Sequence, residues 1–393
     1  MLLKIKDLIS FIGFSFINLI VFPEKKISSK SLLLIRLDAI GDYVLFRNFI
    51  EELKKSEKYG QYKITLLGNI AWKDLAEQLD KEYVDRFIWL DRKKFHRNPV
   101  YRYKKLKDIT STGYEVAISP AYSREFNFTD NINKLVTANE KIASIGDLSN
   151  IRPWQKRISD RYYTRLIPAK DELIFEFYRN KEFFENLLVK KIAVRKPCIG
   201  NVPKTSSFAL PDNYSILFIG ASSSYRKWPL ASFARVAQHL KKEYSHKIVV
   251  CGGSSDQQDI PLFRKHYGND FTDLVGKTSI MDILYVIYNG NLMIANETSA
   301  GHLAVALGMT SVLVIYNGNH FGRFTPYPHE MTDKYHYIYH PDIEKDLGEY
   351  KRLSNIFGYS SKLDIDEISP ATVISRIDKI MNNFSQGKSG PGV

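Results

Sequence analysis

The sequence predicts an α/β protein made of two doubly wound, Rossmann-like domains. The chain has 393 residues, which is long for one ordinary hydrophobic core. Short apolar runs alternate with helical patterns twice along the chain, and this alternation is typical of βαβ units with a parallel sheet. A stretch rich in proline and small residues, 191–213, separates the two halves and is predicted to be an interdomain linker.

The first half, residues 27–190, is predicted to form one domain. We expect its strands at 32–37, 62–68, 85–90, 115–119 and 141–145. We expect its helices at 43–57, 70–80, 100–109 and 124–137, followed by an amphipathic helix within 171–188.

The second half, residues 214–365, repeats the same alternation. We expect its strands at 215–220, 247–251, 291–295 and 311–316. We expect its helices at 229–243, 256–266, 279–288 and 300–307. Residues 366–393 are predicted to form a C-terminal helix, at 370–383, and a flexible tail.

The N-terminal segment, residues 1–26, is apolar from 8 to 22 and has lysines on both sides. As a helix this run would reach about 24 Å, and a full membrane span needs about 20 residues. No small-residue cleavage site follows it, which disfavours a signal peptide. We favour a monotopic membrane anchor with lysines at the headgroups, and the alternative is a helix packed on the body of the protein.

Composition narrows the classes of partner. The chain carries 56 Lys and Arg against 43 Asp and Glu, a formal net charge of +13, which favours polyanionic partners. We find no nucleic-acid module, so a membrane surface or an anionic glycolipid is the better prediction. Cys198 and Cys251 are far apart and lack metal-ligand spacing. The absence of a disulfide framework suits a reducing cytoplasm.

Two turns that follow apolar strands carry candidate functional residues. Residues 296–302 join the strand at 291–295 to a helix, and free N–H groups at the start of that helix can hold an anion such as a pyrophosphate. The alternative is an ordinary turn capped by Thr298 or Ser299. Residues 38–42 likewise join the first strand to a helix. Ligands of α/β proteins bind at such carboxyl ends of strands.

The pair Gly41-Asp42 and the run Glu297-Thr298-Ser299-Ala300-Gly301-His302 together resemble the heptosyltransferases of glycosyltransferase family 9. That family has a Gly-Asp pair after its first strand and an Asp-Thr-Gly-x-x-His pattern in its nucleotide-binding half. Glu297 replaces the family's Asp, and Ser299 replaces its Gly. The resemblance covers roughly residues 31–330 in order and spacing.

The resemblance implies a GT-B fold, in which two Rossmann-like domains face each other across a cleft. It implies Asp42 as the catalytic base, with Gly41 permitting close approach of a ligand. The alternative role for an aspartate here is to cap the following helix, and Asp38 is the better candidate for that role. The C-terminal helix of such enzymes usually crosses back to the first domain. Residues 152–165 are interpreted as a segment facing the acceptor or as a solvated connector.

The remaining candidate site residues belong to the nucleotide-binding half. Ser222, Ser223 and nearby N–H groups are predicted to hold phosphate oxygens. Arg226, which takes the place of the family's Lys, or Lys227 is predicted to neutralise the leaving diphosphate. A solvated basic pair is the alternative.

Two further loops of this half are expected to contact the nucleoside. Gly252 and Gly253 permit close approach, with Ser255 or Asp256 contacting the ribose or base. Lys277 and Thr278 lie in the next loop, which lacks the upstream glycine of a P-loop.

The turn at 296–302 is expected to bind the donor's diphosphate. His302 is predicted to orient the phosphates or assist the leaving group. Glu297 is expected to point away from the phosphates, toward a ribose hydroxyl or a backbone N–H group, because a carboxylate would repel them.

The resemblance thus implies an inverting, metal-independent glycosyltransferase that moves a sugar, expected to be a heptose, from an ADP-linked donor to a lipopolysaccharide-core or other cell-surface glycan. No metal or other cofactor is expected, since no Asp-x-Asp motif occurs in a suitable loop. Expected partners are the nucleotide sugar, an anionic glycolipid or glycan acceptor and the membrane surface, but not nucleic acid. The expected location is the cytoplasmic face of a bacterial inner membrane.

Two alternatives to this function remain. One is a degenerate relative that binds a sugar nucleotide or glycan without turnover. Glu297 and Ser299 motivate it, while Asp42 and His302 oppose it. The other is a nucleotide-dependent dehydrogenase, which is disfavoured because no Gly-x-Gly-x-x-Gly motif follows the first strand.

Overall fold

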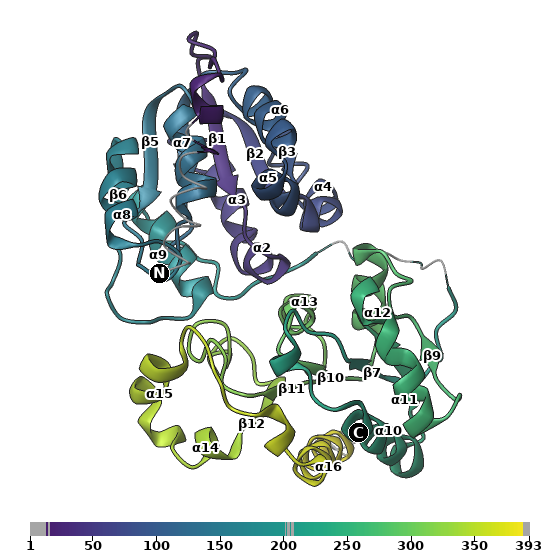
Figure 1. The fold of residues 1–393 in the computed structure, drawn as a ribbon. Helices are drawn as coiled ribbons and strands as arrows, with labels where there is room; N and C mark the ends of the chain where they lie inside the picture. Colours follow the sequence, from purple (N-terminus) through teal and green to yellow (C-terminus); the bar gives the residue numbers. More distant parts are fainter. Residues whose placement is uncertain (1–12, 15, 201, 203–204, 206–207, 388–393) are drawn as a thin grey trace, which may run out of the picture. The chain divides into compact units, whose positions relative to one another are not determined.

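A computed structural model describes residues 13–14, 16–200, 202, 205 and 208–387 of the chain (Figure 1). The chain divides into two compact units. The first consists of Met1–Glu172 and Glu176–Val194, and the second consists of Leu173–Phe175 and Arg195–Val393. The predicted tail beyond 387 and parts of the predicted linker 191–213 lie outside the described residues.

The first unit contains a six-stranded parallel sheet with the strand order β3-β2-β1-β4-β5-β6. All six residues of β1 are buried because the sheet is covered on both faces, which explains the uninterrupted apolar run. The strands are β1 (Ser31–Arg36), β2 (Lys63–Asn69), β3 (Arg86–Leu90), β4 (Tyr114–Ser119), β5 (Ala138–Ser144) and β6 (Arg165–Ile167).

The helices of the first unit depart from prediction in four places. The helix expected at 43–57 starts at Ile40 and is divided at Arg47, neither α5 nor α8 was predicted, and the region 124–137 forms a π-helix at Phe126–Asp130 before α7. The α-helices are α2 (Ile40–Phe46), α3 (Asn48–Lys54), α4 (Lys73–Leu79), α5 (Arg92–Arg97), α6 (Pro99–Ile109), α7 (Asn131–Leu135), α8 (Pro153–Ser159) and α9 (Glu176–Leu188).

The second unit repeats the architecture with a parallel sheet in the order β12-β11-β10-β7-β8-β9. Both units therefore have the Rossmann strand order, read from opposite edges. The strands are β7 (Tyr214–Phe218), β8 (Lys247–Cys251), β9 (Thr272–Asp273), β10 (Leu292–Asn296), β11 (Val312–Tyr316) and β12 (Tyr335–Tyr339).

The C-terminal helix belongs to the second unit. Val373 and Ile377 lie in the core of that unit, and Asp378 Oδ1 lies 2.6 Å from His239 Nε2 of α10. The expectation that this helix crosses back to the first domain is therefore wrong for its described part. The helices of the unit are α10 (Leu230–Tyr244), α11 (Ile260–Tyr267), α12 (Ile280–Asn289), α13 (Ser299–Leu307), α14 (Pro341–Glu344), α15 (Tyr350–Phe357) and α16 (Pro370–Gly387).

The N-terminal segment packs on the first unit with one face. Residues 13, 14 and 16–19 are helical, and Ile17 and Val21 are buried in the core of the unit. Phe16, Leu19 and Phe22 are 68%, 76% and 85% exposed. In the described part of the chain, no helix has the length and apolar character to span a bilayer. Residues 1–12 of the predicted anchor lie outside the described residues.

Each sheet reverses its strand order at one point, and the turns that were predicted to be functional follow the strands at these points. In the first unit the order reverses between β1 and β4, and Asp42 follows β1. In the second unit it reverses between β7 and β10, and Arg226 and Glu297 follow these two strands. Such points open a crevice at the carboxyl ends of the strands, so we looked for sites there.

Candidate active site

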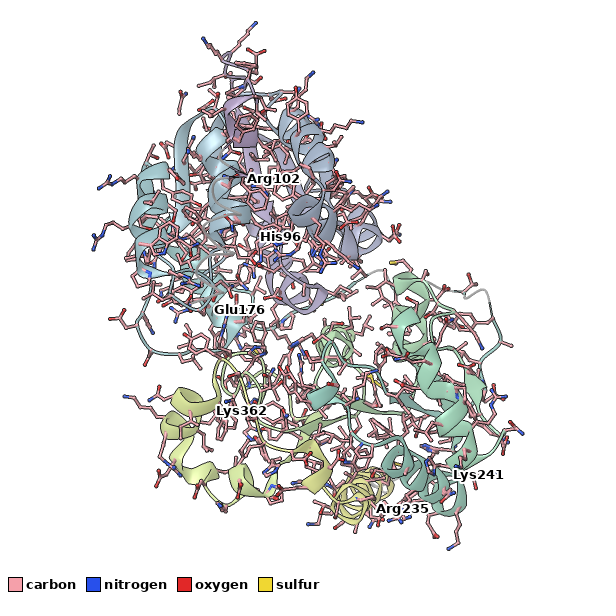
Figure 2. All side chains as sticks on the ribbon, viewed as in Figure 1. His96, Arg102, Glu176, Arg235, Lys241 and Lys362 are labelled. Atoms are coloured by element: carbon pink, nitrogen blue, oxygen red, sulfur yellow. The ribbon has the colours of Figure 1, made fainter. Side chains whose placement is uncertain are left out.

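Arg36 gathers carboxylates at the end of β1. Its Nε atom lies 2.7 Å from Asp38 Oδ2, and its Nη2 atom lies 3.3 Å from Glu176 Oε1 and 4.0 Å from Asp42 Oδ1. Burial lowers the pKa of Arg36, but Asp38, Glu176 and Asp42 outweigh this effect and raise the pKa above its usual value. Arg36, a buried residue that the sequence analysis did not single out, is therefore a permanent positive charge beside Asp42. Figure 2 labels Glu176 in this unit.

The backbone that leads into α2 is fixed by side chains from the neighbouring strand. Asn69, at the end of β2, donates a hydrogen bond from Nδ2 to the carbonyl oxygen of Asp38 at 3.1 Å. Trp72 Nε1 donates to the same carbonyl at 3.0 Å, and its ring stacks on Tyr43 of α2 with centroids 4.5 Å apart. These contacts hold the turn before α2 in one geometry.

Asp42 lies in the first turn of α2, with 23% of its side chain exposed. Gly41 is buried one residue earlier in the same helix. The N-cap residue is Ala39, which makes no side-chain cap, so the expectation that Asp38 caps this helix is wrong. Asp38 pairs with Arg36 instead, while Asp42 keeps an exposed edge on which an acceptor hydroxyl could bind.

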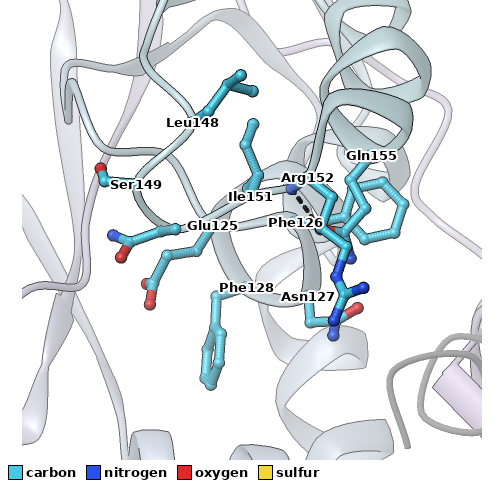
Figure 3. A pocket seen from close by; sticks show the side chains of 10 residues that line it. Glu125, Phe126, Asn127, Phe128, Leu148, Ser149, Ile151, Arg152 and Gln155 are labelled. Atoms are coloured by element: carbon cyan, nitrogen blue, oxygen red, sulfur yellow. Dashed lines mark hydrogen bonds between the residues drawn. The ribbon is translucent and has the colours of Figure 1, made fainter. Parts of the chain in front are cut away.

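A pocket of about 370 Å³ lies on the first unit, beside the same turn (Figure 3). Its walls come from residues 125–128, which follow β4, and from residues 148–155. Arg92 connects the pocket to the Asp42 turn, because Nη1 donates to the carbonyl oxygen of Leu37 at 3.0 Å and to Glu125 Oε2 at 2.6 Å. Nη2 donates to Glu125 Oε1 at 2.7 Å.

Sequence reasoning missed Arg92 and Glu125, although both follow predicted strands closely. Charged residues beyond the carboxyl ends of two parallel strands were the signal that could have found them. The segment 152–165, which was interpreted as either acceptor-facing or a connector, contributes Arg152 and Gln155 to the wall of the pocket.

In the second unit, Arg226 and Glu297 form an ion pair where the strand order reverses. Arg226 Nη2 lies 2.6 Å from Glu297 Oε2, and the same nitrogen donates to the backbone carbonyl of Glu297. Arg226 Nη1 donates to Ser222 Oγ at 3.0 Å. This differs from the expectation that Glu297 points toward a ribose hydroxyl or a backbone N–H group.

Burial sets the ionisation of Glu297. It raises the pKa of Glu297 to about 7, although Arg226 and a hydrogen bond from Asn319 both lower it. Asn319 Nδ2 lies 3.4 Å from Glu297 Oε2. Because the carboxyl group titrates near neutral pH, the pairing of Arg226 depends on pH.

His302 lies in the first turn of α13 and is buried. Its Nδ1 atom lies 2.8 Å from the hydroxyl oxygen of Tyr327. Burial and the charge of Arg226 together lower the pKa of His302 to about 4, so the imidazole is neutral at pH 7. Burial raises the pKa of Tyr327 well above its usual value, so its hydroxyl keeps its proton and can donate to Nδ1. In the tautomer that this bond selects, His302 Nε2 carries the ring proton and can donate a hydrogen bond.

The loop after β11 adds two residues that sequence reasoning missed. Asn319 Nδ2 lies 2.9 Å from His320 Nδ1, and His320 adopts a positive φ of 61°. Strained backbone of this kind clusters at functional sites. Burial lowers the pKa of His320 to about 3, and Arg323 and Arg226 contribute to this shift. The signal was a polar run that follows a predicted strand, Asn317-Gly318-Asn319-His320.

Lys227 points to a different cluster from Arg226. Its Nζ atom lies 2.7 Å from Asp256 Oδ1 and 2.8 Å from Asp259 Oδ2. Burial lowers the pKa of Lys227, but these carboxylates raise it above its usual value. Lys227 therefore holds α11 and the loop before it, and of the two basic candidates Arg226 is the one beside His302.

The predicted close-approach glycines Gly252 and Gly253, together with Gly220, which was not predicted, lie against the carboxylate of Asp256. A Cβ atom on Gly220 would lie 2.1 Å from Asp256 Oδ2, and one on Gly252 would lie 3.1 Å from it. The same oxygen accepts a hydrogen bond from Gly253 N at 2.9 Å. Asp256 is thus enclosed by protein, which leaves the exposed Ser255 as the ribose candidate.

The other predicted donor residues lie around these two clusters. Thr298 caps α13 by accepting a hydrogen bond from Ala300 N at 3.3 Å, and Ser299 begins that helix. Ser223 and Thr278 are half-buried. Lys277 Nζ lies 2.5 Å from Asp273 Oδ2 at the surface.

The structure therefore brings Ser222, Arg226, Glu297 and His302 together. Their roles in binding a donor stay predictions. Within residues 13–14, 16–200, 202, 205 and 208–387, no group of three or more histidine, cysteine, aspartate or glutamate side chains could hold a metal ion.

Residues 190–346 match the family model of glycosyltransferase family 9 (heptosyltransferase). The matched stretch contains every predicted donor-site residue of the second unit. A comparison with curated protein sequences gives no match.

Solved structures with the same fold support the architecture. A glycosyltransferase family 9 protein from Veillonella parvula is 17% identical, with a TM-score of 0.69 over 92% of this chain and 99% of that chain. The Escherichia coli heptosyltransferase WaaC with ADP-2-deoxy-2-fluoro heptose is 12% identical, with a TM-score of 0.64 over 89% and 99%. The E. coli ADP-heptose lipopolysaccharide heptosyltransferase II is 14% identical, with a TM-score of 0.62 over 90% and 99%.

These matches confirm the predicted resemblance and the predicted GT-B type of fold. Residues 190–346 are thus similar to glycosyltransferase family 9 (heptosyltransferase), and the chain shares its fold with solved structures of that type.

Proposed function

We propose that the chain is an inverting, metal-independent glycosyltransferase that transfers a heptose from ADP-heptose to a lipopolysaccharide core or another cell-surface glycan. The observation that carries this proposal is the family 9 match, because it covers the cluster of Arg226, Glu297 and His302. The solved relatives include WaaC with an ADP-heptose analogue and WaaC with ADP, which supports an ADP-linked donor.

Asp42 is the proposed general base. Arg36 favours the ionised form of its neighbour, which is the form that accepts a proton. In the proposed step, Asp42 takes the proton of the acceptor hydroxyl while the hydroxyl oxygen attacks the anomeric carbon of the donor. The bond from that carbon to the diphosphate oxygen breaks, ADP leaves, and the configuration inverts.

Arg226, His302 and the start of α13 are proposed to stabilise the leaving diphosphate. The guanidinium supplies a charge-assisted donor, His302 Nε2 can supply a neutral one, and the positive end of the α13 dipole lies at the same turn. Donors placed where negative charge develops lower the barrier to transfer, and here they would do so without a metal ion.

The N-terminal segment is proposed to hold the enzyme on the cytoplasmic face of the inner membrane. Phe16, Leu19 and Phe22 are exposed apolar side chains, and Lys25 and Lys26 are exposed close to them. Apolar side chains beside lysines suit the boundary between acyl chains and anionic headgroups. A lipid-linked glycan acceptor would lie on the same surface.

One observation favours a second candidate, a protein that binds a sugar nucleotide without turnover. When Glu297 is ionised, its carboxylate pairs with Arg226. This ion pair competes with a bound diphosphate for the guanidinium group. A binding protein can tolerate this competition better than an enzyme that must stabilise a leaving group.

A transfer assay with full-length protein on lipid vesicles tests the proposal. We expect ADP-heptose and a lipid-linked core acceptor to give a product one heptose heavier by mass spectrometry. Asp42→Asn should lower the rate about 10²–10⁴-fold, since that is what loss of a general base costs. Asp74→Asn is the matched control, because Asp74 is an exposed aspartate in the first turn of α4. ADP-heptose binding without hydrolysis or transfer would favour the second candidate.

A further inference from the structure

The pocket on the first unit has the composition of a sugar-binding site. Side chains of residues 125–128 and 148–155 surround it, and Figure 3 shows them coming from two separate segments. Asn127, Ser149 and Gln155 bring amide and hydroxyl groups, while Phe128 brings an aromatic ring. The volume of about 370 Å³ is at the lower end of the range for small-molecule sites, about 300–1,000 Å³.

Gln155 is the most informative residue of the wall. It is 7% exposed, and its Oε1 atom accepts a hydrogen bond from Arg152 N at 2.8 Å. Gln155 also lines the pocket, so its amide nitrogen is a donor to which a ligand hydroxyl there could bind.

The charge of the wall is nearly balanced. Arg92 holds both oxygens of Glu125, at 2.6 and 2.7 Å, so the guanidinium is neutralised at this edge. Arg152 is the other charged side chain of the wall. A site for a phosphate or a sugar carboxylate would present several cations that are not paired with carboxylates.

The pocket is also held in shape from behind. Ser149 Oγ donates to Ser123 Oγ at 2.9 Å, and Asn150 Nδ2 donates to the Ser123 carbonyl oxygen at 3.1 Å. On the other wall, Arg102 Nη2 donates to the carbonyl of Asn127 at 3.1 Å. A wall that is fixed before binding loses less entropy when a ligand arrives.

We propose that this pocket binds a neutral pyranose unit of the acceptor glycan, next to the Asp42 turn. The oxygens of Glu125 and the amides of Asn127 and Gln155 would hydrogen-bond to sugar hydroxyls, and Phe128 would contact the apolar part of the ring. This inference rests on the proposed glycosyl transfer and specifies its acceptor. The overall charge of +13 favours an anionic glycolipid, but the balanced pocket favours a neutral sugar at the subsite beside Asp42.

Binding without a donor tests the subsite separately from catalysis. The probes are neutral methyl hexopyranosides and heptopyranosides, with the corresponding sugar phosphates as competitors, observed by saturation-transfer NMR on the full chain. We expect the neutral glycosides to bind and the phosphates to bind more weakly. Asn127→Ala and Gln155→Glu should each weaken glycoside binding about tenfold.

The variants separate a ligand contact from a folding defect. Gln155→Glu keeps the oxygen that accepts from Arg152 N but loses the amide donor, and Gln78→Glu makes the same change on the exposed face of α4. The melting temperature of each variant should match the wild type. The inference is overturned if no neutral glycoside binds, if the phosphates bind more tightly, or if both pocket variants bind like the wild type. Transfer that continues with unaltered acceptor KM in these variants also overturns it, whereas glycoside binding in a chain without transfer contradicts only the proposed function.

Discussion

Glu297 and Arg226 act as a pair whose strength depends on pH. Burial raises the pKa of Glu297 to about 7, so the carboxyl is largely neutral at pH 6 and largely charged at pH 8. Only the charged form competes with a diphosphate for Arg226. The replacement of aspartate by glutamate in the family pattern thus changes how the site responds to pH.

We predict that ADP binds more tightly at pH 6 than at pH 8, by a fewfold to about tenfold, because one charge-assisted contact is released. Glu297→Gln should bind ADP at pH 8 about as well as the wild type does at pH 6. Isothermal titration calorimetry across this range measures the effect. Glu297→Gln is the internal control, because the phosphate groups of free ADP titrate in the same way in both experiments. A wild-type and variant pair with parallel pH profiles would contradict the prediction.

The same pKa shift makes the stability of the second unit depend on pH. The pKa of Glu297 is about 7 in the folded state and its usual value is 4.5, so the folded state binds the proton more tightly. This contribution to the free energy of unfolding is fully present below about pH 4.5 and is lost as the pH rises through about 7. The difference in melting temperature between the wild type and Glu297→Gln should therefore change between pH 5 and 8, as differential scanning calorimetry can measure.

The N-terminal segment completes the packing around a buried arginine. The guanidinium carbon of Arg102 lies 3.8 Å from the ring centroid of Phe14 and 4.2 Å from that of Phe95. Burial lowers the pKa of Arg102 to about 9, and the side chain donates to the carbonyl oxygens of Phe95 and Asn127. Figure 2 labels Arg102 and the adjacent His96. Because Asn127 lines the sugar pocket, the segment supports one of its walls.

We predict that deleting residues 1–26 lowers the melting temperature of the first unit, because the deletion removes Phe14, Ile17 and Val21 from its surface and core. The single change Phe14→Ala should also destabilise the first unit. We expect it to lower the free energy of unfolding by about 1–2 kcal/mol, because cation–π and packing contacts are lost. Chemical denaturation measures both. Deletion of residues 1–12 alone is the control. A fully stable enzyme that lacks residues 1–26 would falsify this role.

The outer face of the same segment is predicted to bind lipid. Replacing Phe16, Leu19 and Phe22 with serine should abolish flotation with anionic vesicles while leaving the melting temperature unchanged, because these side chains are exposed. Leu262→Ser, which removes an exposed leucine from the second unit, should have no effect on flotation. Equal flotation of the triple variant and the wild type would exclude this face as the anchor.

The two units have separate hydrophobic cores, and the predicted donor site belongs to one of them. The core of the second unit contains residues from Leu217 to Ile380, and that of the first unit contains residues from Ile17 to Val136, so each core is built from its own unit. A ligand stabilises the part of the protein that it contacts.

We predict that ADP at 100 times its dissociation constant stabilises the second unit by about 2.7 kcal/mol and leaves the first unit unchanged. Hydrogen exchange followed by mass spectrometry, read separately for β1 and β10 peptides, measures this effect. The Arg226→Met variant, with its phosphate contact removed, should show little protection at the same ADP concentration. Equal protection of both units by ADP would contradict a donor site within the second unit.

Most of the strands and the Rossmann type of each unit were predictable, because a parallel sheet buried on both faces leaves uninterrupted apolar runs such as 292–295. The strands β6, β9 and β12 were missed. β6 and β9 have three and two residues, which are too few to show a pattern. β12 has the sequence YHYIY, which lacks the aliphatic character of the predicted strands. The helix at 124–137 was wrong because its apolar residues fit a helical period, while buried polar groups such as Asp130 impose a π-helix and a break.

The candidate residues were more predictable than their pairings. Arg226, Glu297 and His302 stand out in the sequence because they follow strands, but their contacts join segments about 70 residues apart. Arg36 could not be found, because an arginine at the end of an apolar strand looks like a surface residue until its carboxylate partners are placed around it. Hydrophobic periodicity in the sequence predicts the helices and strands. Only the three-dimensional arrangement shows which charged side chains pair with one another.

The Phe14–Arg102 contact has a consequence for biosynthesis. Residues 13–22 leave the ribosome well before α6, and translation at about 5–20 residues per second leaves them without their partners for several seconds. During that time the apolar side chains that later enter the core, including Ile17 and Val21, are exposed together with Phe16, Leu19 and Phe22. Until α6 emerges, this segment therefore exposes both its core-facing and its outer apolar side chains. Contact with the bilayer would then precede folding, and α6 would complete the first unit around a segment already held at the membrane.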